Sequence, residues 1–177
     1  MTDDQRVARN PGEPARSGPG GGQRWAGYLD WAREDLIDGV VGLPAELQRA
    51  SRVPSGWTPL ELLNHVLHME QRWFVWGFLG EQVDEPWGDW TVDEPWDTEA
   101  DGRWAVPDGV TAEHLAKRLR AIGRRTSGVL RDVPLGATSS RGGRFAEDPP
   151  TLEWICFHVL AEYARHAGHL DIVVELG

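Results

Sequence analysis

The feature that most constrains this fold is the recurrence of apolar residues every three to four positions in four separate segments of the sequence. Such spacing places the apolar side chains on one face of an α-helix. The four segments span approximately residues 24–41, 59–79, 111–131 and 151–176. No segment alternates apolar and polar residues over enough positions to make a convincing strand. The pattern predicts an all-α protein, a four-helix bundle with two long crossover connections.

Three of the predicted helices begin at recognisable start signals. The sequence TPLE at residues 58–61 combines an N-cap threonine, a proline at the first helical position and a glutamate three residues after the cap, which is the capping-box pattern. Thr111 and Thr151 are placed to cap the third and fourth helices. Gly42, followed by Leu43 and Pro44, is expected to end the first helix.

The segments between the helices are predicted to be connections. Residues 1–22 are rich in Gly, Pro, Arg and Ser, which predicts a disordered N-terminal tail and leaves one domain over residues 23–177. Residues 46–56 are expected to form a loop or a short turn. Residues 81–109 are acidic and rich in tryptophan, and we expect a long ordered loop there. Residues 132–150 are rich in Gly, Ser and Pro and are also expected to be a loop.

Charge and composition exclude several kinds of partner. The formal net charge of −10 would repel phosphate backbones, and the basic residues are scattered, so no nucleic-acid partner is expected. No run of residues approaches the ~20 apolar positions of a membrane span, and the N-terminus lacks the apolar core of a signal peptide. Cys156 is the single cysteine, which fits a reducing compartment. The sequence therefore predicts a soluble cytoplasmic protein without membrane partners.

Near the end of the sequence, one helix face combines an acid and two imidazoles with aliphatic side chains. Glu162, His166 and His169 are spaced i, i+4 and i+7, so they point to the same side of a helix. An ionisable group on an apolar face is costly unless something compensates it. Bundles build metal sites from ligands that project inward from facing helices. We therefore expect Glu162 and His166 to bind one ion together with a third ligand from another helix.

His65 is the best-placed candidate for the third ligand. It lies at the border of the apolar stripe of the second helix, whereas His68 falls on the other side and His114 lies in the first turn of its helix. Three protein ligands with an open position for water or substrate are typical of catalytic zinc. Nitrogen and carboxylate ligands also suit iron, nickel or manganese, so the pattern does not fix the metal.

Other roles for these residues stay open. His169 is a candidate fourth ligand, an orienting residue or a proton acceptor in catalysis. Without a metal, His65 would be a hydrogen-bonded core histidine and Glu162 an ion-pair partner, for example of Arg165. Six tryptophans are candidates to line a substrate cleft. For one of them, Trp73, packing in the core is the favoured role. The set is Trp57, Trp73, Trp76, Trp87, Trp90 and Trp96.

Two motifs resemble a known family. The run GWTPLELLNHVLHMEQRWF at residues 56–74 and the run EYARHAGHLD at residues 162–171 resemble, in this order and separation, the DinB-like superfamily. They are most similar to its actinobacterial branch of mycothiol-dependent enzymes. The resemblance implies a bundle that holds a divalent metal, often zinc or nickel, through one residue of the second helix and two of the fourth. In the mycothiol-dependent maleylpyruvate isomerases this pattern is histidine, glutamate and histidine, which fall on His65, Glu162 and His166. The resemblance also implies a homodimer.

The resemblance further implies a thiol S-transferase. The isomerases carry an additional domain after the bundle and this sequence ends at Gly177, so we expect transfer of mycothiol or another small thiol to an electrophile rather than isomerisation. A metal-dependent hydrolase would use the same three ligands to activate water. A non-catalytic binding or stress-response protein would keep only the scaffold. An enzyme with Cys156 as nucleophile is a further alternative, but Cys156 lies about 120° from Glu162 around the helix, so an inert packed thiol is expected.

Overall fold

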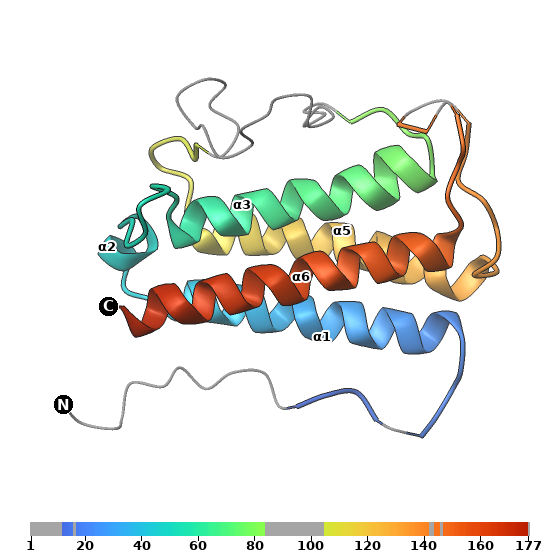
Figure 1. Cartoon of the computed structure of the whole chain (residues 1–177), viewed down its shortest axis with the longest axis horizontal. Helices are drawn as coiled ribbons and strands as arrows, with labels where there is room; N and C mark the ends of the chain where they lie inside the picture. The colour runs from blue at the N-terminus through green and yellow to red at the C-terminus, as the bar shows by residue number, and fades with distance from the viewer. Residues whose placement is uncertain (1–11, 16, 84–104, 142–143, 146, 177) are drawn as a thin grey trace.

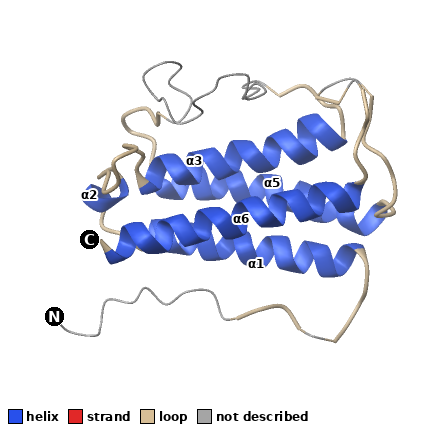
Figure 2. Cartoon of the chain, in the orientation of Figure 1, coloured by secondary structure: helices blue, strands red, loops and turns tan. Residues whose placement is uncertain are grey.

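The structure is a computed structural model, and it is described over residues 12–15, 17–83, 105–141, 144–145 and 147–176. The helical elements are α1 (Gly22–Val41), α2 (Ala45–Gln48), α3 (Pro59–Glu70), η1 (Gln71–Phe78), α5 (Ala112–Asp132) and α6 (Leu152–Glu175). Within these ranges there is no strand, and the one isolated β-bridge pairs Thr138 with Thr151 (Figure 2). The predicted all-α class is therefore confirmed.

The four long helices form a bundle in which each packs against two neighbours. α1 packs against α5 and α6, and α3 packs against the same two helices from the other side (Figure 1). α3 and α5 run in one direction, and α1 and α6 run in the opposite direction. The connection from α3 to α5 therefore has to cross the length of the bundle. The connection from α5 to α6 does not, because these helices are antiparallel and it joins their ends on one side of the bundle. The expectation of a second crossover connection there was therefore wrong.

The predicted helix caps are formed. The Thr58 hydroxyl accepts a hydrogen bond of 3.3 Å from the Glu61 backbone N–H, and the Thr58 N–H donates one of 2.8 Å to the Glu61 carboxylate. Thr111 and Thr151 each accept a 3.2 Å hydrogen bond from the backbone N–H three residues further on. Such caps satisfy N–H groups that a helix start leaves without partners, and each contributes about 1 kcal/mol. The caps therefore fix where α3 and α6, the helices that carry the candidate ligands, begin.

The second predicted helix changes its hydrogen-bond pattern halfway along. α3 ends at Glu70, and η1 continues it as a π-helix. At its end, the Leu79 N–H donates to the Phe74 carbonyl five residues earlier at 3.0 Å. A π-helix holds more residues per turn than an α-helix, so side chains after Gln71 are rotated away from their α-helical positions. The prediction of a helix over this segment is confirmed, but its apolar spacing does not reveal the change of pattern.

The core contains a buried polar cluster that is not among the expectations of the sequence analysis. The Glu70 carboxylate is 0% exposed and accepts two hydrogen bonds of 2.8 Å from Arg33, one of 2.6 Å from Thr126 and one of 2.5 Å from Tyr163. These four residues come from α3, α1, α5 and α6, one from each long helix. A buried ion pair is tolerated only when its hydrogen-bonding groups are satisfied, as they are here. The cluster therefore joins the four helices at one point.

Several predictions fall partly outside the described residues. α1 begins at Gly22, the last residue of the predicted tail, and residues 1–11 of that tail are not described. Residues 84–104 of the tryptophan-rich segment are not described either, and they include Trp87, Trp90 and Trp96. The segment predicted as a loop or short turn overlaps the single helical turn α2, which begins one residue earlier. Over the described residues, no helix has both the length and the apolar character needed to cross a membrane.

Candidate metal centre

His65 lies in the part of α3 that is buried on all sides. Every residue from Leu62 to Glu70 is buried, and the His65 side chain belongs to this run with 6% of its surface exposed. Burial, followed by the nearby His166, holds the pKa of His65 well below 6.5. The imidazole is therefore neutral at physiological pH, which is the form that binds metals.

Glu162 and His166 lie one turn apart on α6. Glu162 Oε2 is 3.4 Å from His166 Nε2, and Glu162 Oε1 accepts a 3.2 Å hydrogen bond from exposed Arg165. The contact with His166 lowers the pKa of Glu162 below its ordinary value, so Glu162 is a carboxylate. The ion pair with Arg165, which the sequence analysis gave as the alternative to metal binding, is present, and the second carboxylate oxygen lies near His166.

The bundle brings His65, Glu162 and His166 together. Each offers a ligand atom within 4.8 Å of the other two, and the rings of His65 and His166 are 4.7 Å apart between centroids. Two ligands of one tetrahedral ion at ~2.1 Å lie about 3.4 Å from each other, which is the separation of Glu162 and His166. Among the described residues, no other group of three His, Cys, Asp or Glu side chains converges in this way. The nitrogen, nitrogen and oxygen donor set fits a divalent metal.

The other histidines of the sequence analysis lie outside this group. His68 is buried at 3% exposure, and burial followed by Arg118 lowers its pKa to about 4. His114 is exposed, as predicted. His169 is half-buried, with its ring centroid 5.5 Å from that of His166, and burial lowers its pKa below 6.5. His169 therefore stands beside the three candidate ligands as a neutral imidazole.

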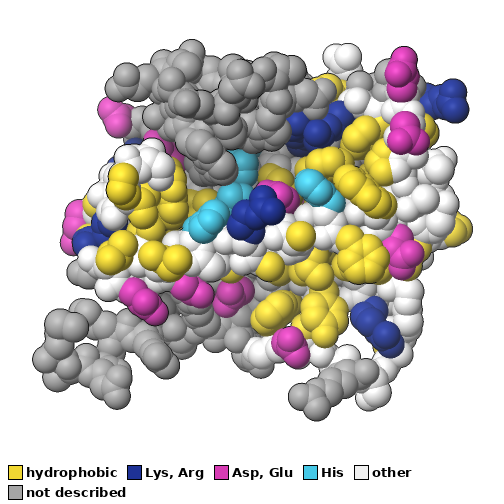
Figure 3. Space-filling model, in the orientation of Figure 1, with side chains coloured by type: hydrophobic (Ala, Val, Ile, Leu, Met, Phe, Trp, Pro, Cys, Tyr) yellow, Lys and Arg dark blue, Asp and Glu magenta, His cyan; other side chains and the backbone are white. Residues whose placement is uncertain are grey.

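An open cleft adjoins the candidate ligands. Its volume is about 380 Å³, and it is walled by segments before α3, by α3 and by the second half of α6. Its lining residues are Val53, Ser55, Trp57, Leu62, His166, His169 and Ile172. Histidines and a mixture of acidic and basic side chains gather along α6 on the face that Figure 3 shows. A small molecule in the cleft would touch both the candidate ligand His166 and the candidate base His169.

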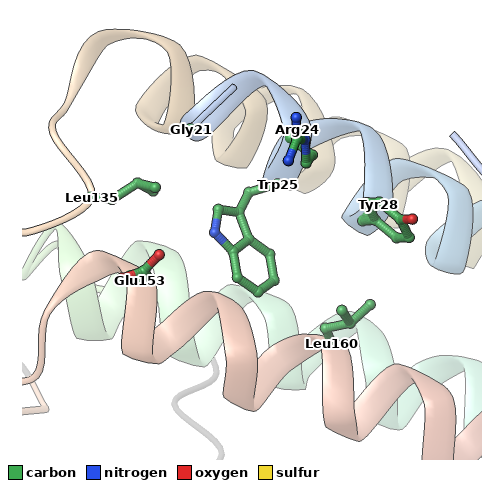
Figure 4. A pocket seen from close by; sticks show the side chains of 7 residues that line it. All are labelled: Gly21, Arg24, Trp25, Tyr28, Leu135, Glu153 and Leu160. Atoms are coloured by element: carbon green, nitrogen blue, oxygen red, sulfur yellow. The ribbon is translucent and has the colours of Figure 1, made fainter. Parts of the chain in front are cut away.

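A second hollow lies between α1 and α6, away from the candidate ligands. Its volume is about 340 Å³, and the Trp25 indole points into the space between the two helices (Figure 4). α6 contributes Glu153 and Leu160 to it, which lie on the side of the helix opposite Glu162. This hollow therefore does not share the chemistry of the candidate centre.

The position of Cys156 in the core makes its thiol unreactive. Its side chain is 0% exposed, and burial raises its pKa to about 12. A reactive cysteine needs an accessible thiolate, which these conditions do not provide.

The sequence analysis missed the polar core cluster of Arg33, Glu70, Thr126 and Tyr163. For two of them, the position on an apolar helix face in the sequence indicates burial. Arg33 lies four residues after Leu29 and three before Leu36, so it shares the buried face of α1. Glu70 follows Val66 by four residues on the buried helix α3. A charged residue on the apolar face of each of two helices indicates a buried ion pair.

The fold and this site together define a class: a helical-bundle protein with a candidate divalent-metal centre built from two facing helices and open to a cleft. The family model for mycothiol-S-transferase matches residues 25–176, and the chain therefore belongs to the mycothiol-S-transferase family. This is a DinB-like branch, so the resemblance seen in the two sequence motifs is confirmed. Comparison with curated proteins and with solved structures gave no match.

Proposed function

We propose that this protein is a metal-dependent S-transferase that joins mycothiol, or a related small thiol, to a small electrophilic substrate. The observation that carries the proposal is the convergence of His65, Glu162 and His166 beside an open cleft in a chain of the mycothiol-S-transferase family. The family supplies the thiol and the transfer reaction. The two imidazoles and the carboxylate are the reason for proposing that the reaction depends on a metal.

Two of the three candidate ligands are in the protonation states that metal binding needs. His65 is neutral and Glu162 is ionised, so no proton has to leave these two groups when a cation binds. Zinc suits two imidazoles and a carboxylate, and nickel suits them as well. A divalent cation bound by these residues would lower the pKa of a thiol that coordinates it, which favours the thiolate at neutral pH.

The residues of the cleft hold the substrates and move the proton. Trp57, Leu62 and Ile172 provide apolar walls against which the substrates can pack. A ring nitrogen of neutral His169 accepts the proton of the thiol. The sulfur then forms a bond to the electrophilic carbon. The bond from that carbon to its leaving group breaks, and the leaving group departs with the electron pair.

The test measures metal content and thiol transfer on the same preparations. The full-length chain is loaded with zinc and assayed with mycothiol and a fluorogenic bromomethyl electrophile, with and without a chelator. His65→Ala and Glu162→Gln are expected to lose bound zinc and to lower the enzymatic rate at least about 100-fold. His169→Gln is expected to keep zinc and to lower the rate about 100-fold, because it removes the proton acceptor.

Two variants serve as controls. His114→Ala removes an exposed histidine outside the site, and Cys156→Ala removes the buried thiol. Both are expected to keep zinc and the native rate. Unchanged zinc content in His65→Ala and Glu162→Gln would remove the metal centre from the proposal. Chelator-sensitive ester hydrolysis without any thiol transfer would favour a hydrolase instead.

A further inference from the structure

The Tyr163 phenol joins the helix that carries two of the candidate ligands to the helix that carries the third. Tyr163 is 0% exposed, and its hydroxyl donates a hydrogen bond of 2.5 Å to Glu70 Oε2. On α6, Tyr163 directly follows Glu162 and precedes His166 by three residues. On α3, Glu70 follows His65 by five residues. The hydrogen bond therefore joins α3 and α6 within about two helical turns of all three candidate ligands.

The Glu70 carboxylate is held in place by donors from two further helices. Arg33 of α1 donates a hydrogen bond of 2.8 Å to each carboxylate oxygen, and Thr126 of α5 donates one of 2.6 Å to Oε1. An arginine that binds both oxygens of a carboxylate restrains the orientation of that group as well as its position. Arg33 is itself confined, because a Cβ atom added at Gly123 would lie 2.6 Å from its Nε. The acceptor of the Tyr163 hydrogen bond is therefore fixed with respect to the bundle.

A metal centre shared by two helices requires that these helices meet in one register. The side chains of a binding site have to be held within about 0.5 Å of the required geometry by the packing and hydrogen bonds around them. Apolar contacts between helices are non-directional, so they stabilise the bundle without fixing the register to this accuracy. A hydrogen bond has a preferred length and direction. The bond between Tyr163 and Glu70 therefore provides a directional contact that apolar packing does not.

We propose that Tyr163 and Glu70 are positioning residues of the metal centre. Their hydrogen bond sets the register of α6 against α3, so that Glu162 and His166 meet His65 at metal-binding distance. This inference rests on the proposed function and adds to it two fully buried residues that are not candidate ligands. Loss of the hydrogen bond changes the geometry of the centre as well as the stability of the fold, which distinguishes this role from that of a general core contact.

The test measures how cobalt(II) binds to the full-length chain after a chelator has removed other metals. Cobalt(II) is used in place of zinc because its visible absorption bands report the coordination geometry. Tyr163→Phe keeps the ring and removes the donor to Glu70. This variant is expected to raise the Kd for cobalt(II) about 10–100-fold, the usual effect of losing a residue that orients a ligand, and to shift the absorption bands.

Thr126→Val is the matched control. It removes another donor to the same carboxylate, but Thr126 lies on α5, which carries none of the three candidate ligands. The link between α3 and α6 stays intact, and Arg33 still holds Glu70 through two hydrogen bonds. Thr126→Val is therefore expected to keep the native absorption bands and a Kd within about twofold of the native value. Sucrose in the buffer keeps a destabilised variant folded, which circular dichroism verifies.

A native Kd and native absorption bands in folded Tyr163→Phe would overturn the inference and leave the hydrogen bond a purely structural contact. An equal rise in Kd in Thr126→Val would also overturn it, because any loosening of the core would then have the same effect. Failure of the proposed function gives different results. If the native chain binds no cobalt(II), the metal centre and this inference both fail. If the variants behave as expected but no thiol transfer occurs, the positioning role stands and the transferase proposal fails.

Discussion

Gly123 is the residue that makes room for the buried guanidinium of Arg33. A Cβ atom at position 123 would lie 2.6 Å from Arg33 Nε and closer still to Cζ. Arg33 cannot move away without breaking its two hydrogen bonds to Glu70. Gly123→Ala is therefore expected to lower the free energy of unfolding by about 1–3 kcal/mol, although alanine is the better helix former. Urea denaturation followed by circular dichroism measures this change.

Gly128 provides the control for this prediction in the same helix. A Cβ atom there would meet only Arg131 Nη2, at an ordinary contact distance of 3.9 Å. Gly128→Ala is expected to leave the stability unchanged or to raise it by up to ~1 kcal/mol, because only the conformational cost of glycine changes. Equal effects of the two substitutions would show that Arg33 does not pack closely against Gly123.

At the scale of single residues, the sequence predicts the candidate ligands better than the buried ion pair. Glu162 and His166 are on one helix, where a spacing of four residues fixes their relative direction without any knowledge of the fold. His65 follows from its position on the apolar stripe of another helix. The pairing of Arg33 with Glu70 depends on how α1 and α3 meet, which no single-helix pattern contains. Sequence spacing therefore shows which way the side chains of one helix point, but it does not show which residues of another helix they contact.

α3 and α6 are tied together by the hydrogen bond between Tyr163 and Glu70. Burial, and next the Glu70 charge, raise the pKa of Tyr163 well above 10, so the phenol is protonated and donates to the carboxylate. Tyr163→Phe keeps the ring and removes this donor. We expect the free energy of unfolding to fall by about 1–3 kcal/mol, because the buried carboxylate loses one of its hydrogen bonds. Thermal or urea unfolding measures the loss.

A double-mutant cycle assigns the effect to the cluster. Thr126→Val removes another donor to Glu70, so its effect and that of Tyr163→Phe are expected to be non-additive. Tyr28→Phe, on the half-buried surface of α1, is the matched control and is expected to change stability by less than ~0.5 kcal/mol. Strict additivity, or a loss in the Tyr28 variant equal to that of Tyr163→Phe, would contradict the role given to the cluster.

At the scale of the elements, caps and periodicity predict where helices begin but not every detail of their backbone. Thr58, Thr111 and Thr151 are local signals, and their caps depend only on the next few residues. The π-helix η1 has poorer backbone geometry than an α-helix, so contacts between elements must compensate for it. Trp73 makes such contacts with Phe145 and with His158 of α6. These contacts are set by the fold, which explains why periodicity alone predicts one continuous helix.

For the whole molecule, the sequence predicts four packed helices but leaves their directions open. α5 has 21 residues and is about 32 Å long, a distance that about ten extended residues can span. The connection between α3 and α5 is longer than this, so it permits either a parallel or an antiparallel arrangement. The structure has the parallel one, which places α6 antiparallel to α3 and lets His65 face Glu162 and His166. The candidate centre is thus a consequence of the packing of the whole bundle.

Because the candidate ligands meet only in the folded bundle, zinc is expected to stabilise the whole molecule. A ligand that binds only the native state adds about 2.7 kcal/mol at 100 times its Kd. For a chain of this size that corresponds to a rise in Tm of about 5–10 °C. The measurement is the Tm of chelator-treated protein followed by circular dichroism over a series of zinc concentrations.

The difference in Tm with and without zinc, rather than Tm itself, tests the site, since removing a buried histidine can lower stability by itself. His65→Ala is expected to abolish the zinc-dependent rise, because it leaves two ligands on α6 and breaks the link to α3. His114→Ala is expected to keep the full rise, which also controls for zinc bound by exposed carboxylates of this acidic chain. An equal rise in both variants would mean that zinc stabilises the protein from somewhere other than His65, Glu162 and His166.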